Sequence, residues 1–175
     1  MPIQSNRSRG ADSPDIATYR ALRAAGKSWF AKIVRHPANR QFDLVKAAKN
    51  LKHPVLGRTL VFEDETAGAV LADYYLFDYR PAGKSLAETC VFSPGELTPL
   101  EAEFHQAKLA SRTSLFEVAA LHDERPKILL RDRLNKDAPE FWLTDLALAE
   151  SFHRIGAKVL VFTRVVSLRG LHMTG

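Results

Sequence analysis

The chain has 175 residues and a net charge of +5, with 46% hydrophobic and 26% charged residues. This balance excludes a disordered tail, and no apolar run approaches the roughly 18 residues that a transmembrane helix needs. The single cysteine, Cys90, excludes an intramolecular disulfide and a cysteine-built zinc site, which favours a reducing cytoplasm. Residues 1–12 lack the hydrophobic centre of a secretory signal and are predicted to be a disordered leader.

The charge is distributed unevenly along the chain. Residues 1–60 contain 12 Lys and Arg against 3 Asp and Glu, residues 61–110 contain 3 against 9, and residues 111–175 contain 10 against 8. Two interpretations follow: the basic and acidic segments neutralise each other or are solvated, or the basic face meets a phosphate backbone. We favour the first, because most lysine-rich helix faces are simply solvated.

Helices are expected at the start of the chain. Ser13 and Pro14 are typical of an N-cap and the first helical position, and Gly26 is predicted to end this helix as a left-handed cap. A second helix should follow and stop at His36. Its apolar side consists of Trp29, Phe30, Ile33 and Val34.

A third, basic helix is predicted over residues 38–54. Its inward side consists of Phe42, Val45, Ala48 and Leu51. The candidate nucleic-acid-binding residues on and beside it are Arg35, Arg40, Lys46, Lys49, Lys52 and Arg58. His36 and His53, each before a proline, are interpreted as last-turn residues facing helix carbonyls and not as metal ligands, because a zinc site needs three or four converging side chains.

Two Gly-Lys-Ser tripeptides, at Gly26 and at Gly83, raise the possibility of a phosphate-binding loop. Such a loop needs another glycine five residues before the Gly-Lys pair, so that backbone N–H groups converge on the phosphates. Ala21 and Asp78 occupy those positions here. We therefore expect no nucleotide site, and interpret Gly83 as a turn residue after Pro81.

Two more helices are predicted in the middle of the chain. Residues 66–80 are apolar around much of the helix circumference, which is typical of a helix central to a core. Residues 97–112 begin with Thr98 as N-cap, Pro99 at the first position and Glu101 three residues on, which is a capping box.

From Ser114 onward the hydrophobic period changes to that of strands. The short apolar runs cover residues 114–122, 127–134, 140–145, 157–168 and 170–175. Residues 146–156 are interpreted as a connection. The predicted fold class is therefore α+β, with a helical region at residues 13–111 packed on a small four- or five-stranded β-barrel at residues 114–175.

The stretch from Asp73 to the end of the chain resembles a group of uncharacterised bacterial proteins. The resemblance is carried by "DYYLFDYRPAGKSLAE", by "SLFEVAALHDERPKILLRDRLNKDAPEFWLTD" and by "GAKVLVFTRVVSLRGLHMTG". It implies a helical front half and a small C-terminal barrel. Some members of that group carry a cysteine-rich SEC-C-type zinc motif, which is absent here. The resemblance implies an architecture without an activity.

Searches for catalytic and metal constellations give no assignment. Glu101, Glu103 and His105 are close in sequence, and Glu150 and His153 have the Glu-x-x-His spacing of carboxylate-bridged metal helices, but that spacing occurs once where a diiron site needs two. Asp132 and Asp145 flank a predicted strand, a common place for turn aspartates. Cys90 lies among apolar neighbours and is interpreted as a buried bystander. We predict no catalytic residues, no metal and no cofactor.

The sequence leaves two classes of function open. The first is a non-enzymatic module that binds another protein or another copy of itself. The alternative is a nucleic-acid-binding protein that uses the basic N-terminal helices, although the aromatic residues are spaced for a core and not for a stacking platform. An enzyme ranks third, and no contact with a membrane is expected.

Overall fold

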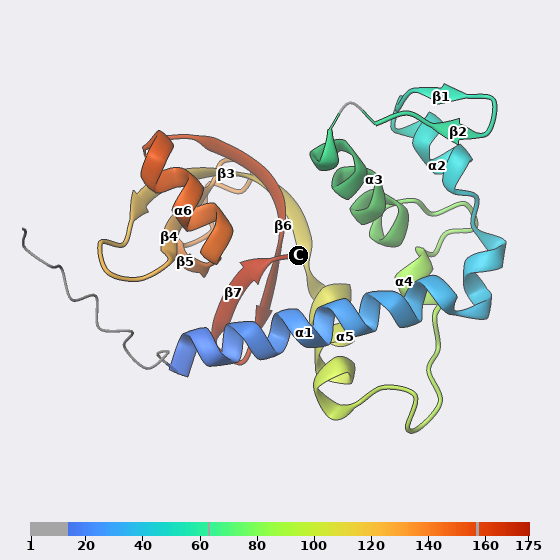
Figure 1. Cartoon of the computed structure of the whole chain (residues 1–175), viewed down its shortest axis with the longest axis horizontal. Coiled ribbons are helices and arrows are strands. Elements are labelled where there is room, and N and C mark those ends of the chain that lie inside the picture. The colour runs from blue at the N-terminus through green and yellow to red at the C-terminus, as the bar shows by residue number, and fades with distance from the viewer. Residues whose placement is uncertain (1–13, 63, 157) are drawn as a thin grey trace, which may run out of the picture.

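A computed structural model describes residues 14–62, 64–156 and 158–175, and places the helices before a barrel, as predicted (Figure 1). The helical part consists of α1 (Pro14–Arg35), the 3₁₀ helix η1 (Pro37–Gln41), α2 (Leu44–Asn50), a hairpin of β1 (Val55–Leu56) and β2 (Thr59–Leu60), α3 (Glu65–Phe77), α4 (Leu86–Thr89) and α5 (Pro99–Ala110). The barrel part consists of β3 (Arg112–Leu121), β4 (Lys127–Asp132), β5 (Phe141–Thr144), α6 (Leu146–Ile155), β6 (Leu160–Leu168) and β7 (Leu171–Thr174). The α+β class is confirmed. Ser13 and the leader lie outside the described residues.

The barrel is closed, in the strand order β3-β4-β5-β7-β6. Strand β3 pairs antiparallel with both β4 and β6, and the contact between β5 and β7 is parallel. Helix α6 connects the third and fourth strands and packs Ala149 and Phe152 into the barrel core. This order, with a helix in that connection, is the topology of the OB fold, a small Greek-key barrel.

Helix α1 runs unbroken through Gly26, so the predicted left-handed cap there is wrong. Trp29 and Ile33 are buried as expected, whereas Phe30 and Val34 are exposed. Glycine is needed at position 26 for a different reason: a Cβ there would lie 2.6 Å from Cζ of Phe104 on α5. The long helix passes along the barrel end and the helical part (Figure 1).

The single helix predicted over residues 38–54 is interrupted. Asp43 has an extended backbone and accepts hydrogen bonds from the N–H groups of Val45 and Lys46, which makes it the N-cap of α2. The preceding residues form η1 instead. Leu51, expected to point inward, is 38% exposed. The hairpin β1–β2, which was not predicted, follows α2.

Both middle helices form where they were predicted, but the first half of α3 is not central to the core, because Val70 is 41% exposed. Helix α3 covers most of residues 66–80 and buries Leu71, Leu76 and Phe77. Helix α5 begins at Pro99, and its capping box is complete: Thr98 Oγ1 accepts from Glu101 N–H, and the Glu101 carboxylate accepts from Thr98 N–H.

Helix α6 occupies residues that were interpreted as a connection. Asp145 is its N-cap and accepts a hydrogen bond from Leu148 N–H, 3.0 Å between the two atoms. The connection therefore caps one end of the barrel instead of crossing the surface as a loop.

Two hydrophobic clusters hold the fold together. One lies inside the barrel and includes Phe116, Leu130 and Phe152. The other is built on the helices around Trp29, but it also takes in residues of β6 and β7. Helices and barrel thus share a core. Among the described helices, none combines the length and the apolar character that a membrane span requires.

Candidate functional site

The six predicted basic residues follow one another along the edge of the helical part. Arg35 ends α1, Arg40 lies in η1, Lys46 and Lys49 lie in α2, Lys52 follows α2, and Arg58 lies in the β1–β2 turn. All six side chains are exposed. None of them forms a salt bridge with a carboxylate of the described residues. We call these six residues the basic surface.

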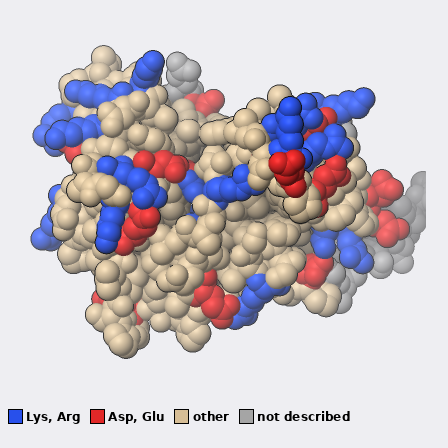
Figure 2. All heavy atoms as spheres, turned by 180° about the vertical axis from the view of Figure 1, so that it is seen from behind, with Lys and Arg blue, Asp and Glu red and all other residues tan. Residues whose placement is uncertain are grey.

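Figure 2 shows Lys and Arg side chains gathered over this part of the molecule, at the upper left, whereas positive and negative groups are intermingled over the barrel. Five carboxylates of the acidic middle segment pair with basic residues outside the basic surface. Their ion pairs are Glu88–Arg80, Glu101–Lys32, Glu103–Arg169 and the pairs of Asp73 and Asp78 with Arg164. These five carboxylates therefore form no salt bridge with the basic surface.

A cleft of about 660 Å³ lies between α3 and the barrel. One wall carries Val70 of α3 and Leu51, and the other carries Phe162 and Thr163 of β6. A second hollow of about 350 Å³ shares Leu51, Thr66 and Val70 with the cleft and continues to Lys52. The cleft thus runs up to the basic surface.

Arg164 organises the floor of the cleft. Its side chain is 5% exposed, and its Nε donates to both carboxylate oxygens of Asp73 at 3.0 Å. One Nη donates to Asp78 Oδ2 at 2.7 Å and the other to the Ser111 carbonyl at 3.1 Å. The guanidinium group therefore links α3 and the α5–β3 connection to the barrel. Its single positive charge is paired with the two negative charges of Asp73 and Asp78.

Lys108 lies next to this network and is buried. Its Nζ is 4.9 Å from the centre of the Phe77 ring, while the Arg164 guanidinium is 4.4 Å from the same ring. Burial lowers the pKa of Lys108 to about 8, an effect that Arg164 adds to and Asp73 opposes. The ammonium group makes cation–π contacts with Phe77 and Phe104 and no hydrogen bond within the described residues.

Two aromatic side chains are exposed on the outside of the barrel, contrary to the expectation that the aromatic residues serve the core. Phe162 is 64% exposed in the cleft, and Trp142 on β5 is 41% exposed with His122 edge-on to it at 5.6 Å. Both stand on strands whose alternate residues point inward. The barrel can therefore offer ring faces to a ligand.

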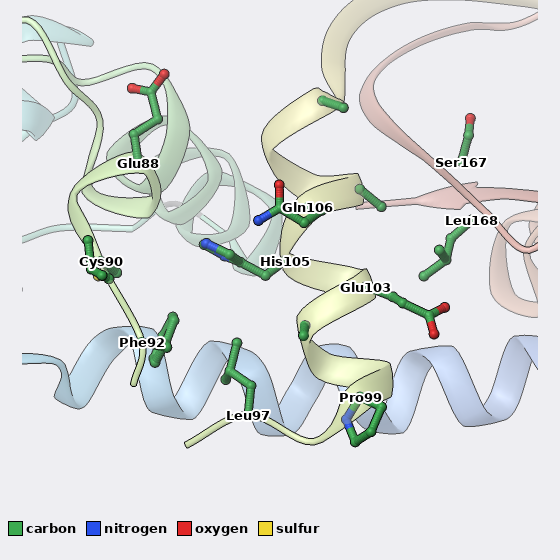
Figure 3. Close-up of a pocket in the computed structure, with 14 residues that line it drawn as sticks. Glu88, Cys90, Phe92, Leu97, Pro99, Glu103, His105, Gln106, Ser167 and Leu168 are labelled. Atoms are coloured by element: carbon green, nitrogen blue, oxygen red, sulfur yellow. The ribbon is translucent and has the colours of Figure 1, made fainter. Parts of the chain in front are cut away.

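A second cavity, of about 940 Å³, lies between α5 and the segment that follows α4 (Figure 3). His105 projects toward the side that carries Cys90 and Phe92. Trp29 Nε1 donates to His105 Nδ1 at 3.0 Å, so the neutral ring carries its proton on Nε2. Burial lowers the pKa of His105 and raises the pKa of the Cys90 thiol to about 11. A protonated Nε2 cannot activate a protonated thiol, which agrees with the bystander interpretation of Cys90.

Glu101, Glu103 and His105 do not form a cluster. The Glu101 side chain caps α5 and accepts from Lys32 Nζ at 2.7 Å, and Glu103 points the other way, toward Leu168, and pairs with Arg169 at 2.8 Å (Figure 3). Side chains that are close in sequence on a helix point in different directions. The closeness of these three residues in the sequence therefore does not indicate a shared site.

The remaining acidic candidates have structural roles. Asp132 accepts hydrogen bonds from Ser114 Oγ and from two backbone N–H groups, and pairs with Arg112 at 2.6 Å. Asp145 pairs with Arg23 and accepts from Thr174. These two aspartates share no hydrogen-bond or ion-pair partner among the described residues.

Glu150 and His153 are exposed on α6, and Glu150 pairs with Arg154. His36 caps η1 through Nδ1, and its Nε2 lies 3.1 Å from the Val91 carbonyl, which is not a carbonyl of its own helix. His53 packs on Phe62, and its buried Nε2 has no hydrogen-bond partner among the residues that the structure describes. Within residues 14–62, 64–156 and 158–175, no three His, Cys, Asp or Glu side chains are placed to share a metal ion.

Neither Gly-Lys-Ser tripeptide forms a phosphate-binding loop. Gly26 and Lys27 lie inside α1. Gly83 has a φ of +83° in a turn, as predicted, and Ser85 is the N-cap of the four-residue helix α4. The Ser85 N–H bonds to the Glu88 carboxylate, so an acidic group occupies the place a phosphate would take.

Comparison with protein families identifies a matching family model. The model described as "Family of unknown function (DUF7986)" matches residues 13–175, which is nearly the whole chain. No curated protein and no solved structure matches it.

Proposed function

The chain belongs to the DUF7986 family, whose function is unknown, and we propose that it is a non-enzymatic nucleic-acid-binding protein that holds a phosphate backbone on its basic surface. The observation that carries the proposal is that all six side chains of this surface are exposed and unpaired within the described residues. Unpaired Lys and Arg side chains release counterions when they neutralise phosphates, and this release drives sequence-independent binding.

The barrel supports the same proposal by analogy of fold. OB barrels bind oligonucleotides or oligosaccharides on their outer face and loops, with aromatic rings as stacking platforms. This barrel has the same strand order and two exposed aromatic side chains, Phe162 and Trp142. A fold hosts many functions, so the analogy adds to the charge argument and does not replace it.

The test is a titration of labelled single- and double-stranded oligonucleotides across a salt series. A variant with Lys46, Lys49 and Lys52 changed to Gln removes three charges from the basic surface. We expect the wild type to bind at low salt and the variant to bind at least about tenfold more weakly. Each lost phosphate contact should flatten the plot of log affinity against log salt by about 0.7 to 0.9.

A matched control removes the same charge elsewhere. Lys27, Lys84 and Lys136 are exposed and lie outside the basic surface, so their change to Gln should leave the salt slope nearly unchanged. Equal loss in both triple variants, or no binding by the wild type at low salt, would contradict the proposal.

A second candidate function is binding of another protein or of a second copy of the chain. It is favoured by exposed apolar side chains at the cleft, Phe162, Val70 and Leu51, and by Leu160, two residues before Phe162 on β6. Exposed apolar patches commonly mark interaction surfaces. Sedimentation across a concentration series tests the self-association form, which predicts a dimer that Phe162→Ala weakens.

We also propose a cytoplasmic location and a bacterial source. Cys90 is buried and unpaired, which fits a reducing compartment, and the resemblance noted above is to bacterial proteins. Localisation of a tagged chain in a bacterial host tests the first point.

A further inference from the structure

The cleft between α3 and the barrel lies next to the basic surface at Lys52. The two hollows share Leu51, Thr66 and Val70, and the smaller one reaches Lys52. A polymer whose phosphates lie along Lys49 and Lys52 therefore passes the mouth of the cleft. What enters the cleft is then decided by its walls and floor.

The wall formed by β6 offers an aromatic ring. Phe162 is 64% exposed, and it stands opposite Leu115 in the β3–β6 ladder, so the strand pairing fixes its backbone. A ring held on a rigid strand can stack on a nucleobase of any sequence, because every base has a π face. Thr113 and Thr163 beside it add hydroxyl groups that donate and accept hydrogen bonds.

The floor around Arg164 disfavours a phosphate, and Arg112, the other basic residue that lines the cleft, pairs with Asp132. Arg164 already donates from Nε and both Nη atoms to Asp73, Asp78 and the Ser111 carbonyl. Asp78 is 49% exposed at its side chain, so its carboxylate faces the solvent of the cleft. A carboxylate repels a phosphate but accepts hydrogen bonds from the exocyclic amino groups of bases.

We propose that the cleft receives unpaired bases of a single-stranded nucleic acid, with the bases directed inward and the phosphates held outside on the basic surface. This inference rests on the proposed function and adds the substrate class. In a duplex, stacking and pairing hide the base faces and edges that Phe162 and Asp78 would contact. The protein should therefore prefer single strands to duplexes of the same sequence.

The experiment compares Phe162→Ala with the wild type on single and double strands. We expect the wild type to favour single strands by about tenfold or more, and Phe162→Ala to lose about tenfold of the single-strand affinity while duplex affinity and the salt slope stay unchanged. Phe162→Tyr keeps a ring and should restore binding. Phe30→Ala removes an exposed ring from α1 that does not line the cleft, and should have little effect.

Failure of this inference is distinguishable from failure of the proposed function. The inference about the cleft is wrong if the wild type binds single strands and duplexes equally well, or if Phe162→Ala binds single strands like the wild type. In either case, weaker binding by the lysine variant would still support the proposed function of the basic surface. No binding of any oligonucleotide overturns both. In that case a loss of self-association in Phe162→Ala would assign the cleft to protein contact instead.

Discussion

The ring of Phe104 lies directly against the backbone of α1 at Gly26, at a distance that leaves no space for a side chain. A Cβ on Gly26 would be 2.6 Å from Cζ of that ring, closer than carbon atoms approach in folded proteins. Helices α1 and α5 therefore cross at the one residue type that allows it.

We expect Gly26→Ala to lower the free energy of unfolding by about 1 to 3 kcal/mol, because Phe104 must leave its place in the core. The change runs against helix propensity, which favours Ala over Gly by about 1 kcal/mol. Gly68 in α3 is the matched control, since its Cβ would meet Phe62 at an ordinary 3.6 Å. Gly68→Ala should be neutral or stabilising in urea denaturation, and effects of the same sign at both sites would contradict the account.

Gly26 also shows a limit of what could be predicted from the sequence. Local signals were sufficient where the structure obeys local rules: the capping box at Thr98 and the strand-like period after Ser114 both predicted real elements. The need for glycine at position 26 comes from its contact with Phe104, which is 78 positions away in the sequence. Local sequence patterns cannot predict such a contact. Asp43 was not predicted to be an N-cap, because the helical pattern of apolar residues continues on both sides of it.

The candidate site divides in the same way. The exposure of Lys46 and Lys49 on α2 followed from their spacing opposite apolar residues, whereas the hairpin that carries Arg58 was not predicted. The cleft could not be predicted in this way, because Arg164 bonds to Asp73 and Asp78, which lie 91 and 86 positions earlier in the sequence. Helix α6 was missed because its apolar residues were interpreted as a surface connection, although Asp145 followed by "LALAESF" is an N-cap before an amphipathic run.

Glu101 should make stability depend on acid pH. Burial raises the pKa of Glu101, but hydrogen bonds from Lys32, Ser28 and Thr98 outweigh it and hold the pKa at about 2. Because the folded pKa lies below the unfolded one, the stabilisation is full above about pH 5 and is lost as the pH falls toward 2. Glu101→Gln should therefore lower the unfolding free energy at pH 7 by about 2 kcal/mol, with a difference that shrinks on acidification.

Glu103→Gln provides the comparison. Glu103 also pairs with an arginine, but both side chains are exposed, and solvent screens such pairs. Denaturation curves from pH 7 to 3 should show a much smaller effect at this position. A Glu101→Gln deficit that does not change with pH would point to lost packing and not to charge.

The charge of Lys108, unlike that of Glu101, should destabilise the fold, and stability should rise at alkaline pH as that charge is lost. Burial lowers its pKa to about 8, so the unfolded chain binds more protons between pH 8 and 10.5, and wild-type stability rises through that range. Lys108→Met keeps the length and removes the charge. We expect the variant to be more stable than the wild type at pH 7 by about 2 kcal/mol, with the gain declining by pH 10.

The control for this prediction is Lys136→Met at an exposed site, where no gain is expected. Urea denaturation at pH 7, 9 and 10 gives the comparison. If Lys108→Met is less stable at every pH, the cation–π contacts with Phe77 and Phe104 outweigh the cost of burial.

Lys84 should play no part in nucleotide binding. It is exposed, and the turn before it leads into a capping box and not into an anion-binding loop. Calorimetric titration with ATP and magnesium should show no binding by the wild type, and Lys84→Ala should fold normally. A micromolar dissociation constant that the substitution abolishes would contradict this prediction.

Because the helical part and the barrel share a core, the helical part cannot complete its folding before the barrel has been synthesised. Trp29 leaves the ribosome early, yet the cluster around it is completed by Val166, Leu171 and Met173, which are made more than a hundred residues later. The nascent helical part must therefore wait with an unfinished apolar surface, a condition that promotes aggregation. Expressed alone, residues 14–110 should need a chaperone to remain in solution, and adding the barrel as a separate chain should rescue them.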